Sequence, residues 1–343
     1  MIAQDRALRG IAAAKQLYFG AAAAWPLLRD DETYARHFAA ECNMLVPENA
    51  LKMGPVHPEP DRYNFEPGDF MAAFCQRHGM KMRGHTLVWH TQIFPWFKEK
   101  VNSNNARQIL EEHIRTVAGH YRGRIESWDV VNEAIEIKDG LAGGLRKTPW
   151  LELLGPEYLD MAFRAAREAN PGAALVYNDY GLDYEDPPSQ AKREAVLKLL
   201  RGMLERKVPL DGFGTQAHLN AANRSKFSPD GLRKFLGDVA ALGLRIYVTE
   251  LDVVDQSLPD DINERDQAVA EFYESYLTAA LSEKAVCAVL TWGLTDRYTW
   301  LARRHPRASG EPIRPLPLDR DYNRKPAWRA IGRAFQSRPA PPR

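Results

Sequence analysis

Eight short runs rich in apolar, β-branched and aromatic residues recur along the chain, with amphipathic stretches between them. We expect strands at residues 17–22, 44–48, 81–89, 127–133, 174–178, 212–218, 245–250 and 286–292. Helical periodicity is clearest over residues 106–120, 158–169, 190–207 and 264–281. Ser228-Pro229 has the pattern of a helix N-terminus. Strands that alternate with helices in this way predict an α/β protein, a single-domain (β/α)8 TIM barrel.

The sequence offers no sign of a second domain. No long linker, charge run or low-complexity block divides the 343 residues. A doubly wound open sheet, the structural alternative, would need a Gly-rich phosphate loop after an early strand, and the sequence has none. We therefore expect one barrel domain over residues 1–337 and a disordered, Pro-rich tail over residues 338–343.

Charge and cysteine content argue against several kinds of partner. Lys and Arg number 46 against 45 Asp and Glu, a formal net charge of +1, so nothing indicates binding to nucleic acid. Three cysteines cannot all pair internally, and we expect Cys42, Cys75 and Cys287 to be buried free thiols. No apolar run reaches the about 18 residues of a membrane span. A monomer without metal, cofactor or membrane partner is expected.

The N-terminal region carries no clear export signal. Residues 11–14 are too short for a signal core and precede Lys15, while residues 21–28 are interpreted as part of the fold. Two expectations remain open. The protein is secreted or periplasmic if a signal peptide has been removed, and it is cytoplasmic if this chain is full length.

Two glutamates at the ends of strand-like runs carry the strongest chemical signal. Glu133 ends the run SWDVVNE and Glu250 ends the run RIYVTE. In an α/β barrel, active-site residues lie at the carboxyl ends of the strands. Either glutamate alone would more often be a charged residue where a strand meets solvent. Two carboxyl groups facing each other across a sugar are the minimum needed to break a glycosidic bond, so the pair favours catalysis.

Together the predicted strand ends supply a polar and aromatic ring that core packing does not explain. Its members are Glu48, Asn49, His85, Trp89, Asn132, Asn178, Tyr180, Gln216, His218, Asp252 and Trp292. Asp252 follows Glu250 by two residues, so strand alternation places both side chains on one face. Asp252 can then orient His218 and favour its protonated form, which would donate to Glu250. Asp129, deeper in its strand, and Glu136, beyond the rim, are less suitable carboxylates.

The segments around these residues resemble glycoside hydrolase family 10, the endo-β-1,4-xylanases. Its two signature segments resemble WDVVNEA, which contains Glu133, and VTELD, which contains Glu250. Further similarities are RGHTLVWH, PEN, QAH, WGLTD with Trp300, and YNRKPA, so the resemblance runs in order from about Tyr18 to Ala327. It implies a barrel that hydrolyses internal β-1,4-xylosidic bonds of xylan and xylo-oligosaccharides with retention of the anomeric configuration.

The resemblance also implies roles for individual residues. Glu133 would be the general acid/base and Glu250 the nucleophile, and such a pair needs carboxyl groups about 5–5.5 Å apart, one protonated and one ionised. Asn132 would hydrogen-bond the sugar 2-hydroxyl, and His218 and Asp252 would support the nucleophile. The sugar-binding set is Glu48, Asn49 and Lys52 on the non-reducing side, Asn178 and Tyr180 on the leaving-group side, and His85, Trp89, Gln92, Gln216, Trp292 and Trp300.

Two features depart from the family pattern or extend it. The family usually has a Trp directly after the lysine that corresponds to Lys52, and here Met53 stands in that place, which predicts softer packing behind the non-reducing side. The loop at residues 141–150 follows the strand of Glu133 and is expected to shape the leaving-group side. Trp128, Trp150 and Trp328 are expected in the core.

Three alternatives remain beside this interpretation. One is another retaining β-glycosidase on the same scaffold, active on cellobiosides or plant glycosides. A non-catalytic sugar-binding barrel is disfavoured because it would gain nothing from a second buried carboxylate. A metal-dependent hydrolase would need clustered ligands, but no His-x-His occurs, and alternation predicts that His85 and His90, five apart, point to opposite faces.

Overall fold

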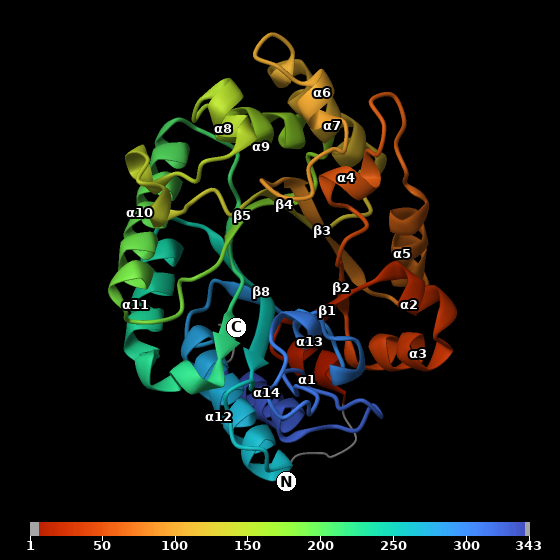
Figure 1. The fold of residues 1–343 in the computed structure, drawn as a ribbon, viewed down its shortest axis with the longest axis vertical. Coiled ribbons are helices and arrows are strands. Elements are labelled where there is room, and N and C mark those ends of the chain that lie inside the picture. Colours follow the sequence, from red (N-terminus) through yellow and green to blue (C-terminus); the bar gives the residue numbers. More distant parts are fainter. Residues whose placement is uncertain (1–6, 340–343) are drawn as a thin grey trace.

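In the computed structural model, which describes residues 7–339, a parallel sheet closes on itself at the centre of a ring of helices (Figure 1). Its strands within these residues are β1 (Tyr18–Ala23), β2 (Met44–Pro47), β3 (Lys81–Val88), β4 (Ser127–Asn132), β5 (Ala174–Asp179), β6 (Gly212–Thr215), β7 (His218–Asn220), β8 (Arg245–Val254) and β9 (Val286–Thr291). β1 pairs with β9 and β6 pairs with β8, so eight of these strands form a closed barrel. The predicted (β/α)8 barrel is confirmed.

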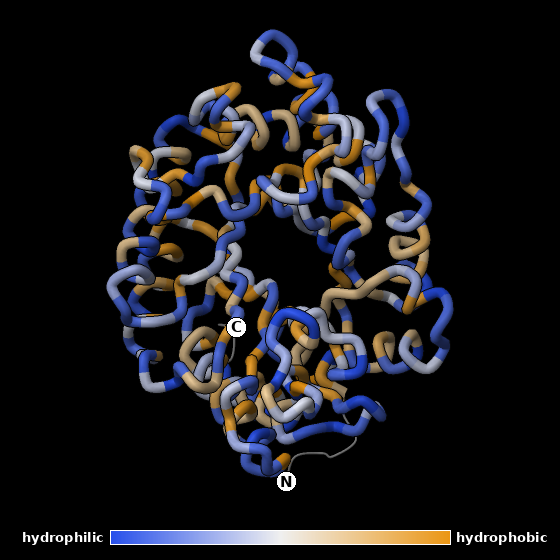
Figure 2. Tube along the Cα trace, viewed as in Figure 1, coloured by the Kyte–Doolittle hydropathy of each residue, from blue (hydrophilic) through white to orange (hydrophobic). Residues whose placement is uncertain are grey.

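Helices surround the barrel and separate its strands along the chain (Figure 1). They are α1 (Leu8–Ala13), α2 (Trp25–Asp30), α3 (Glu32–Glu41), α4 (Met53–Val56), α5 (Glu66–Arg77), α6 (Phe97–Lys100), α7 (Ala106–His120), α8 (Pro149–Leu154), α9 (Tyr158–Ala169), α10 (Pro187–Glu205), α11 (Pro229–Ala240), α12 (Ile262–Ala280), α13 (Leu301–Arg304) and α14 (Pro326–Ser337). Figure 2 shows hydrophobic and hydrophilic positions interleaved along these helices, as expected when one face packs on the sheet.

The helices that sequence periodicity predicts are present with small shifts. α7 and α9 begin and end at the predicted residues, whereas α10 and α12 begin a few residues earlier. Capping explains the earlier starts. The side chain of Asp186 accepts a hydrogen bond from the amide of Ser189 at the start of α10, and Asp261 caps α12 in the same way. Ser228 caps α11 as predicted, by accepting from the amide of Gly231.

Two strand boundaries differ from the prediction, and both differences bear on the site. The expected strand at residues 212–218 is divided, because Ala217 has a φ of 61° and separates β6 from β7. β7 then pairs with the far end of β8, with His218 opposite Asp252. This pairing extends β8 to Val254, so Glu250 lies inside the strand and not at its end.

The core contains the aromatic residues that the sequence analysis placed there. Trp128, Trp150 and Trp328 are all buried, as is Met53. Cys42 and Cys75 are buried free thiols, while Cys287 is also free but only partly buried. Among the described residues every helix is too short or too polar to span a bilayer.

The two ends of the described chain are close together (Figure 1). α1 packs against α14, and the ammonium group of Lys15 donates to the main-chain oxygen of Arg338 at 2.8 Å. The side chain of Arg338 donates to the carbonyl of Lys284 at 3.0 Å. Of the predicted tail at 338–343, residues 340–343 lie outside the described residues.

Gly84 provides a test of the close packing between strands. It lies in β3 opposite Trp128 of β4, and a Cβ atom at this position would lie 2.1 Å from Cε3 of the buried indole. We expect Gly84→Ala to lower the free energy of unfolding by about 3 kcal/mol, because neither backbone nor ring can move away easily.

Gly119 is the matched control for that substitution. It lies in α7, and a Cβ atom there would meet nothing within 4 Å. Gly119→Ala is expected to stabilise the protein by roughly 0.5–1 kcal/mol through helix propensity and loss of unfolded-state entropy. Urea denaturation of both variants measures the difference. Equal stabilities of the two variants would contradict the packing described at Gly84.

Candidate active site

A cleft of about 540 Å³ opens at the carboxyl ends of the barrel strands. This volume is within the range of ligand-binding sites. It is lined by Glu48, Asn49, Lys52, His85, Trp89, His90, Thr91, Gln92, Asn132, Glu133, Tyr180, Gln216, His218, Glu250, Trp292, Trp300, Arg303 and Arg304. The cleft thus gathers fourteen of the sixteen residues that the sequence analysis proposed for the site, and Asn178 and Asp252 are buried behind it.

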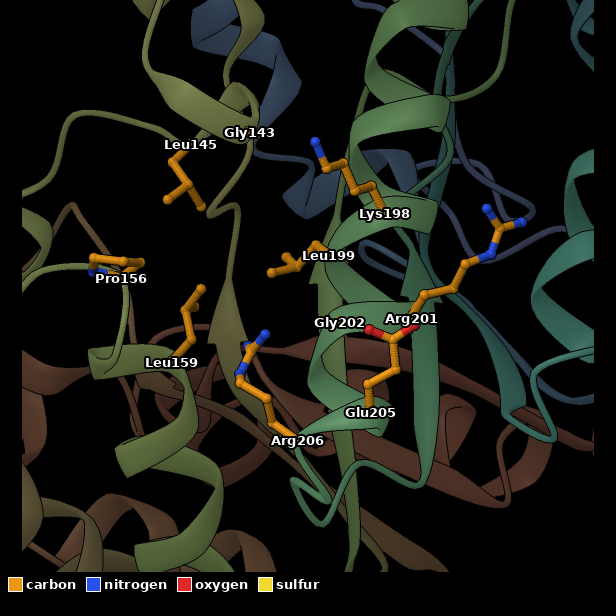
Figure 3. Close-up of a pocket in the computed structure, with 10 residues that line it drawn as sticks. All are labelled: Gly143, Leu145, Pro156, Leu159, Lys198, Leu199, Arg201, Gly202, Glu205 and Arg206. Carbon is orange, nitrogen blue, oxygen red and sulfur yellow. The ribbon is translucent and has the colours of Figure 1, made fainter.

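A second cavity, of about 550 Å³, lies on the outer wall of the barrel (Figure 3). The loop at Gly143 and Leu145 lies on one side, and residues of α10 from Lys198 to Glu205, with Arg206 directly after it, lie on the other. Its lining has no aromatic ring and a single carboxylate, Glu205. The cavity therefore lacks the paired carboxyl groups and aromatic surfaces that the barrel cleft brings together.

Glu133 is held in an unusual backbone conformation directly after β4. Its φ is 59°, a left-handed value that costs a non-glycine residue roughly 1–2 kcal/mol. The amide of Glu133 donates to the carbonyl of Asn178 at 2.8 Å, and its own carbonyl accepts from Nε of Arg146 at 2.7 Å. These two bonds fix the turn, which directs the carboxyl group into the cleft instead of continuing the alternation of the strand.

Three donors surround the carboxyl group of Glu133. Its Oε2 accepts from Nε1 of Trp89 at 2.9 Å, and its Oε1 accepts from Nε2 of Gln216 at 3.0 Å and from Nδ2 of Asn132 at 3.1 Å. All three donors are neutral indole or amide groups. These neutral donors position the carboxyl group of Glu133 without a hydrogen bond from a cationic side chain.

Glu250 has a different environment from Glu133. Its Oε1 accepts from Nδ2 of Asn178 at 2.8 Å, and its Oε2 lies 3.2 Å from Nε2 of His218. Nδ1 of the same imidazole lies 2.9 Å from Oδ1 of Asp252. The second oxygen of Asp252 accepts from Nε1 of Trp300 at 2.9 Å, which orients the aspartate.

This arrangement sets the charge of Glu250. Burial would lower the pKa of His218, but Asp252 and Glu250 together raise it well above its usual value, so the ring is an imidazolium. Burial would likewise raise the pKa of Glu250, yet the hydrogen bond from His218, together with the electrostatic effects of His85 and His218 and the hydrogen bond from Asn178, outweighs burial, and the pKa of Glu250 is lowered. Glu250 is therefore ionised over a wider range of pH than an isolated glutamate.

Buried amides connect the two glutamates. Nδ2 of Asn178 donates to Oδ1 of Asn132 at 2.9 Å as well as to Glu250, and Nε2 of Gln216 lies 3.3 Å from the same Asn132 oxygen. Oγ1 of Thr249 donates to Oδ1 of Asn178 at 2.8 Å, which fixes the orientation of that amide. A displacement of any one of these amides would move both carboxyl groups.

The prediction that Asn178 lines the leaving-group side is wrong. Its side chain is fully buried, and it does not line the cleft. Asn178 is part of β5, and its amide donates to Glu250 and to Asn132 within the barrel. Tyr180, two residues further on and past the end of the strand, does line the cleft.

Glu48, Asn49 and Lys52 form one hydrogen-bonded group after β2. Nζ of Lys52 donates to Oδ1 of Asn49 at 3.0 Å, and Nδ2 of Asn49 donates to Oε1 of Glu48 at 3.3 Å. The ammonium group also lies 5.0 Å from the ring centre of Trp89 and 5.9 Å from that of Trp292. Burial lowers the pKa of Lys52 and raises that of Glu48. Lys52 is therefore part of the cleft and not an ordinary solvated side chain.

His85 and His90 both line the cleft, so the prediction that they point to opposite faces is wrong. β3 ends at Val88, and strand alternation does not extend to His90. Nδ1 of His85 lies 3.0 Å from Asp129, which also pairs with Arg83, so Asp129 serves as an anchor. Burial lowers the pKa of His90 to about 4, and the ring is neutral near pH 7. Within residues 7–339 no group of three or more His, Cys, Asp or Glu is placed to hold a metal ion.

Sequence reasoning missed several residues of the site. His90, Thr91, Arg303 and Arg304 line the cleft, and Arg146 contacts Glu133 from behind. Nη2 of Arg146 also donates to the hydroxyl of Tyr180 at 2.8 Å, which places the loop at residues 141–150 beside the cleft as expected. In the sequence, the one indication that Arg146 belongs to the site was its position in that loop.

An α/β barrel whose cleft holds two unequal carboxyl groups among aromatic and amide side chains has the groups that glycoside hydrolysis requires. The family model described as Glycosyl hydrolase family 10 matches residues 7–334. The chain therefore belongs to glycosyl hydrolase family 10, and the resemblance noted in its sequence is confirmed.

Individual relatives agree with this assignment over nearly the whole chain. The chain is 36% identical over 334 residues to endo-1,4-beta-xylanase B of Thermotoga neapolitana, which covers 96% of this chain and 91% of that protein. It is 36% identical over 330 residues to the thermostable celloxylanase of Thermoclostridium stercorarium, with 88% of this chain and 80% of that protein covered. The structure of xylanase 10B from Thermotoga petrophila RKU-1 in complex with xylobiose superimposes with a TM-score of 0.88 at 35% identity, covering 97% of this chain and 98% of that chain.

Proposed function

We propose that the chain is an endo-1,4-β-xylanase that hydrolyses internal β-1,4-xylosidic bonds with retention of the anomeric configuration. The unequal environments of Glu133 and Glu250 carry this proposal. Glu250 contacts an imidazolium and is held ionised, whereas Glu133 contacts only neutral donors. A double displacement needs this division between a nucleophile that stays charged and an acid that carries a proton.

In the first step, Glu133 gives its proton to the glycosidic oxygen while a carboxylate oxygen of Glu250 attacks C1 from the opposite face. The C1–O bond to the leaving sugar breaks, and a glycosyl ester of Glu250 forms with inverted configuration. Asn132, which lies between the two carboxyl groups, is placed to bind the sugar 2-hydroxyl, a contact that strengthens in the transition state.

In the second step, the Glu133 carboxylate removes a proton from a water molecule that attacks C1. The ester bond breaks, Glu250 leaves as a carboxylate, and the second inversion restores the β configuration. The imidazolium of His218 stabilises Glu250 each time it becomes charged. Trp292 and Trp300 offer aromatic faces on which a pyranose ring can stack.

The choice of xylan is supported by the relatives. The first of those compared is an endo-1,4-beta-xylanase, and the superimposed structure contains xylobiose. The celloxylanase relative favours a second candidate, activity on β-1,4-glucan chains as well. We expect kcat/KM for xylohexaose to exceed that for cellohexaose at least about tenfold, since rejecting one additional group in a fitted pocket is worth 10–200-fold.

Product analysis of xylohexaose digests with anomer detection tests this function. The expected first products are shorter oligomers from internal cleavage, with β anomers at the new reducing ends. Equal or greater rates on cellohexaose would favour the second candidate. Release of single xylose units from one end would contradict endo action.

His218→Asn provides a test of how the nucleophile is kept ionised. Glu250 attacks only as a carboxylate, so activity is present above its pKa and is lost as the pH falls through it. Without the imidazolium, the pKa of Glu250 loses the hydrogen bond that lowers it most and rises, so the acidic limb of the kcat/KM profile moves to higher pH. At neutral pH we expect kcat/KM to fall by about 10–100-fold, the value of a charge-assisted hydrogen bond.

His78→Asn is the control for that experiment. His78 follows α5, is exposed, and is not among the residues of the cleft. Its pH–rate profile should coincide with that of the unmodified protein. An unchanged acidic limb in His218→Asn would refute the role given to the imidazolium.

We further propose that the chain acts as a monomeric catalytic domain spanning residues 1–337, with xylan and xylo-oligosaccharides as its ligands. One chain supplies both carboxyl groups and their hydrogen-bond partners, so the proposed reaction needs no second subunit. A polymeric substrate cannot cross a cell membrane, which supports a secreted or periplasmic location, whereas action on imported xylo-oligosaccharides would fit the cytoplasmic alternative. The molar mass from light scattering tests the monomer. Fractionation of producing cells tests the location.

A further inference from the structure

The cavity on the outer wall of the barrel is separate from the cleft (Figure 3). Among the described residues, the two linings have no member in common. Hydrogen bonds fix the loop on its rim, because the amide of Glu136 donates to the carbonyl of Gly144 at 2.9 Å and the amide of Arg146 donates to the carbonyl of Ala134 at 2.7 Å. The cavity of about 550 Å³ is therefore enclosed by fixed segments and is large enough for a small ligand.

The middle of this cavity is apolar. The side chains of Leu145 and Leu159 point toward Leu199 of α10, and Pro156 completes this part of the lining (Figure 3). Leu159 is buried, whereas Leu145 and Leu199 are half-buried and have apolar surface left to cover. Without an aromatic ring the lining offers no flat face for a sugar. A ligand with apolar atoms suits it better than a carbohydrate.

Gly202 opens the floor of the cavity. It lies in the last turn of α10, where glycine is a poor helix former. A Cβ atom there would lie 3.1 Å from Nη1 of Arg206 and, apart from the backbone of the helix, would meet no other described atom within 4 Å. Close packing of the backbone therefore does not require this glycine, and the missing side chain leaves room beside the guanidinium group.

Arg206 is held in one orientation with one nitrogen unused. Its Nε and Nη2 donate to the two carboxylate oxygens of Asp160 at 2.7 and 2.8 Å. Its Nη1, beside Gly202, has no hydrogen-bond acceptor among residues 7–339. At the other end of the cavity the ammonium group of Lys198 extends toward the loop at Gly143 (Figure 3). Spacings of four residues place Lys198, Gly202 and Arg206 along one face of the helix, over about 12 Å.

The charges around the cavity leave one positive charge in excess. Asp160 neutralises Arg206, and Lys198 and Arg201 then stand against the single carboxylate of the lining, Glu205. Within the described part of the chain, Lys198, Arg201 and Glu205 form no ion pair or hydrogen bond. This balance suits a ligand with a single negative charge, and a fixed guanidinium donor suits a carboxylate in particular.

We propose that the outer cavity is a binding site for a small organic acid, a monocarboxylate with an apolar body. The carboxylate accepts from Nη1 of Arg206 above Gly202, and the apolar body lies between Leu159 and Leu199. This inference goes beyond the proposed function and does not depend on the reaction in the cleft. Because Arg206 is half-exposed, the contribution of the charge is moderate and is weakened by salt.

Titration calorimetry with 3-phenylpropionate tests the proposed ligand class. We expect saturable binding with a Kd of about 5 mM or tighter for a ligand of this size. The neutral 3-phenylpropionamide should bind about fivefold more weakly, with a smaller difference in high salt. Equal affinities for the acid and the amide, or no saturable binding of the acid up to about 50 mM, would overturn the proposal.

Gly202→Leu locates the ligand. The new side chain would occupy the space beside Arg206, and leucine favours the helix, so we expect a folded protein that binds 3-phenylpropionate at least about tenfold more weakly. Gly237→Leu is the control, because Gly237 lies in α11 outside both cavities and a Cβ atom there would meet no described atom within 4 Å. Unmodified affinity in a folded Gly202→Leu would refute the site.

Two charge variants should change the affinity in opposite directions. Arg206→Gln should lower the preference for the acid over the amide about fivefold, and Glu205→Gln should raise it about twofold. A change in the same direction in both variants would contradict the charge balance described.

Turnover of xylohexaose distinguishes the outer cavity from the cleft. Competitive inhibition by 3-phenylpropionate, with an inhibition constant equal to its Kd, would place the ligand in the cleft and overturn the proposal. Since binding is measured directly, a failure of the proposed xylanase function would leave the test of the outer cavity intact.

Discussion

Glu250→Ala is expected to lower kcat for xylohexaose by at least about 10⁴-fold, which corresponds to roughly 5.4 kcal/mol of transition-state stabilisation. The substitution removes the group proposed to form the bond to C1. It also leaves the donors of Asn178 and His218 without their acceptor. Steady-state kinetics with sensitive detection of reducing ends measures the loss.

Glu126→Ala is the control for loss of a glutamate. Glu126 directly precedes β4, at the opposite end of the strand from the cleft, and pairs with Lys81 at 3.0 Å on the surface. Glu126→Ala should change kcat less than about twofold, because Glu126 does not line the cleft and its exposed ion pair contributes about 1 kcal/mol or less to stability.

For Glu250→Ala, added azide should not restore a product of retained configuration. A variant that keeps more than a few per cent of activity would exclude Glu250 as the nucleophile.

Glu133→Ala is expected to show a loss that depends on the leaving group. With xylohexaose, whose leaving sugar needs a proton, kcat should fall by about 10²–10⁴-fold, the range of general acid–base catalysis. With an aryl β-xylobioside bearing an acidic phenol, bond cleavage needs little protonation. The glycosyl ester should then form readily and accumulate, because no base remains to activate water.

Azide distinguishes the two carboxyl groups. In Glu133→Ala, azide can enter the space left by the carboxyl group and attack the glycosyl ester without a general base. The product should be a β-xylosyl azide, since two inversions have then taken place at C1. An α-xylosyl azide from Glu133→Ala, identified by its NMR coupling constants, would reverse the two roles or refute retention.

The barrel could be predicted because its signals are local. Each strand is a short β-branched and aromatic run, and each of the long helices has a clear 3.6-residue period. Once the strands are in register, their carboxyl ends meet at one rim, so Glu133, Trp89 and His218 converge without any further information. Alternation also placed Glu250 and Asp252 correctly on one side, where both contact His218.

The remaining features depend on contacts between distant segments. β8 continues past Glu250 because β7 pairs with it, and β7 exists as a separate strand because the chain turns at Ala217. Asn178 differs from Asn132 in no local property that would reveal which of the two buried amides lines the cleft. Arg303 comes from a helix after the last strand, and the rule that strand ends supply the site does not include it.

Trapping of the glycosyl–enzyme ester tests the assignment of the two glutamates most directly. An activated 2-deoxy-2-fluoro-β-xylobioside lacks the 2-hydroxyl whose contacts stabilise both transition states, so the second step is slowed more than a step driven by a good leaving group. Peptide mass spectrometry after incubation should find one fluoroxylobiosyl group, attached to the peptide that contains Glu250. A group attached to Glu133, or turnover to an α product with no attached sugar, would contradict the proposed mechanism.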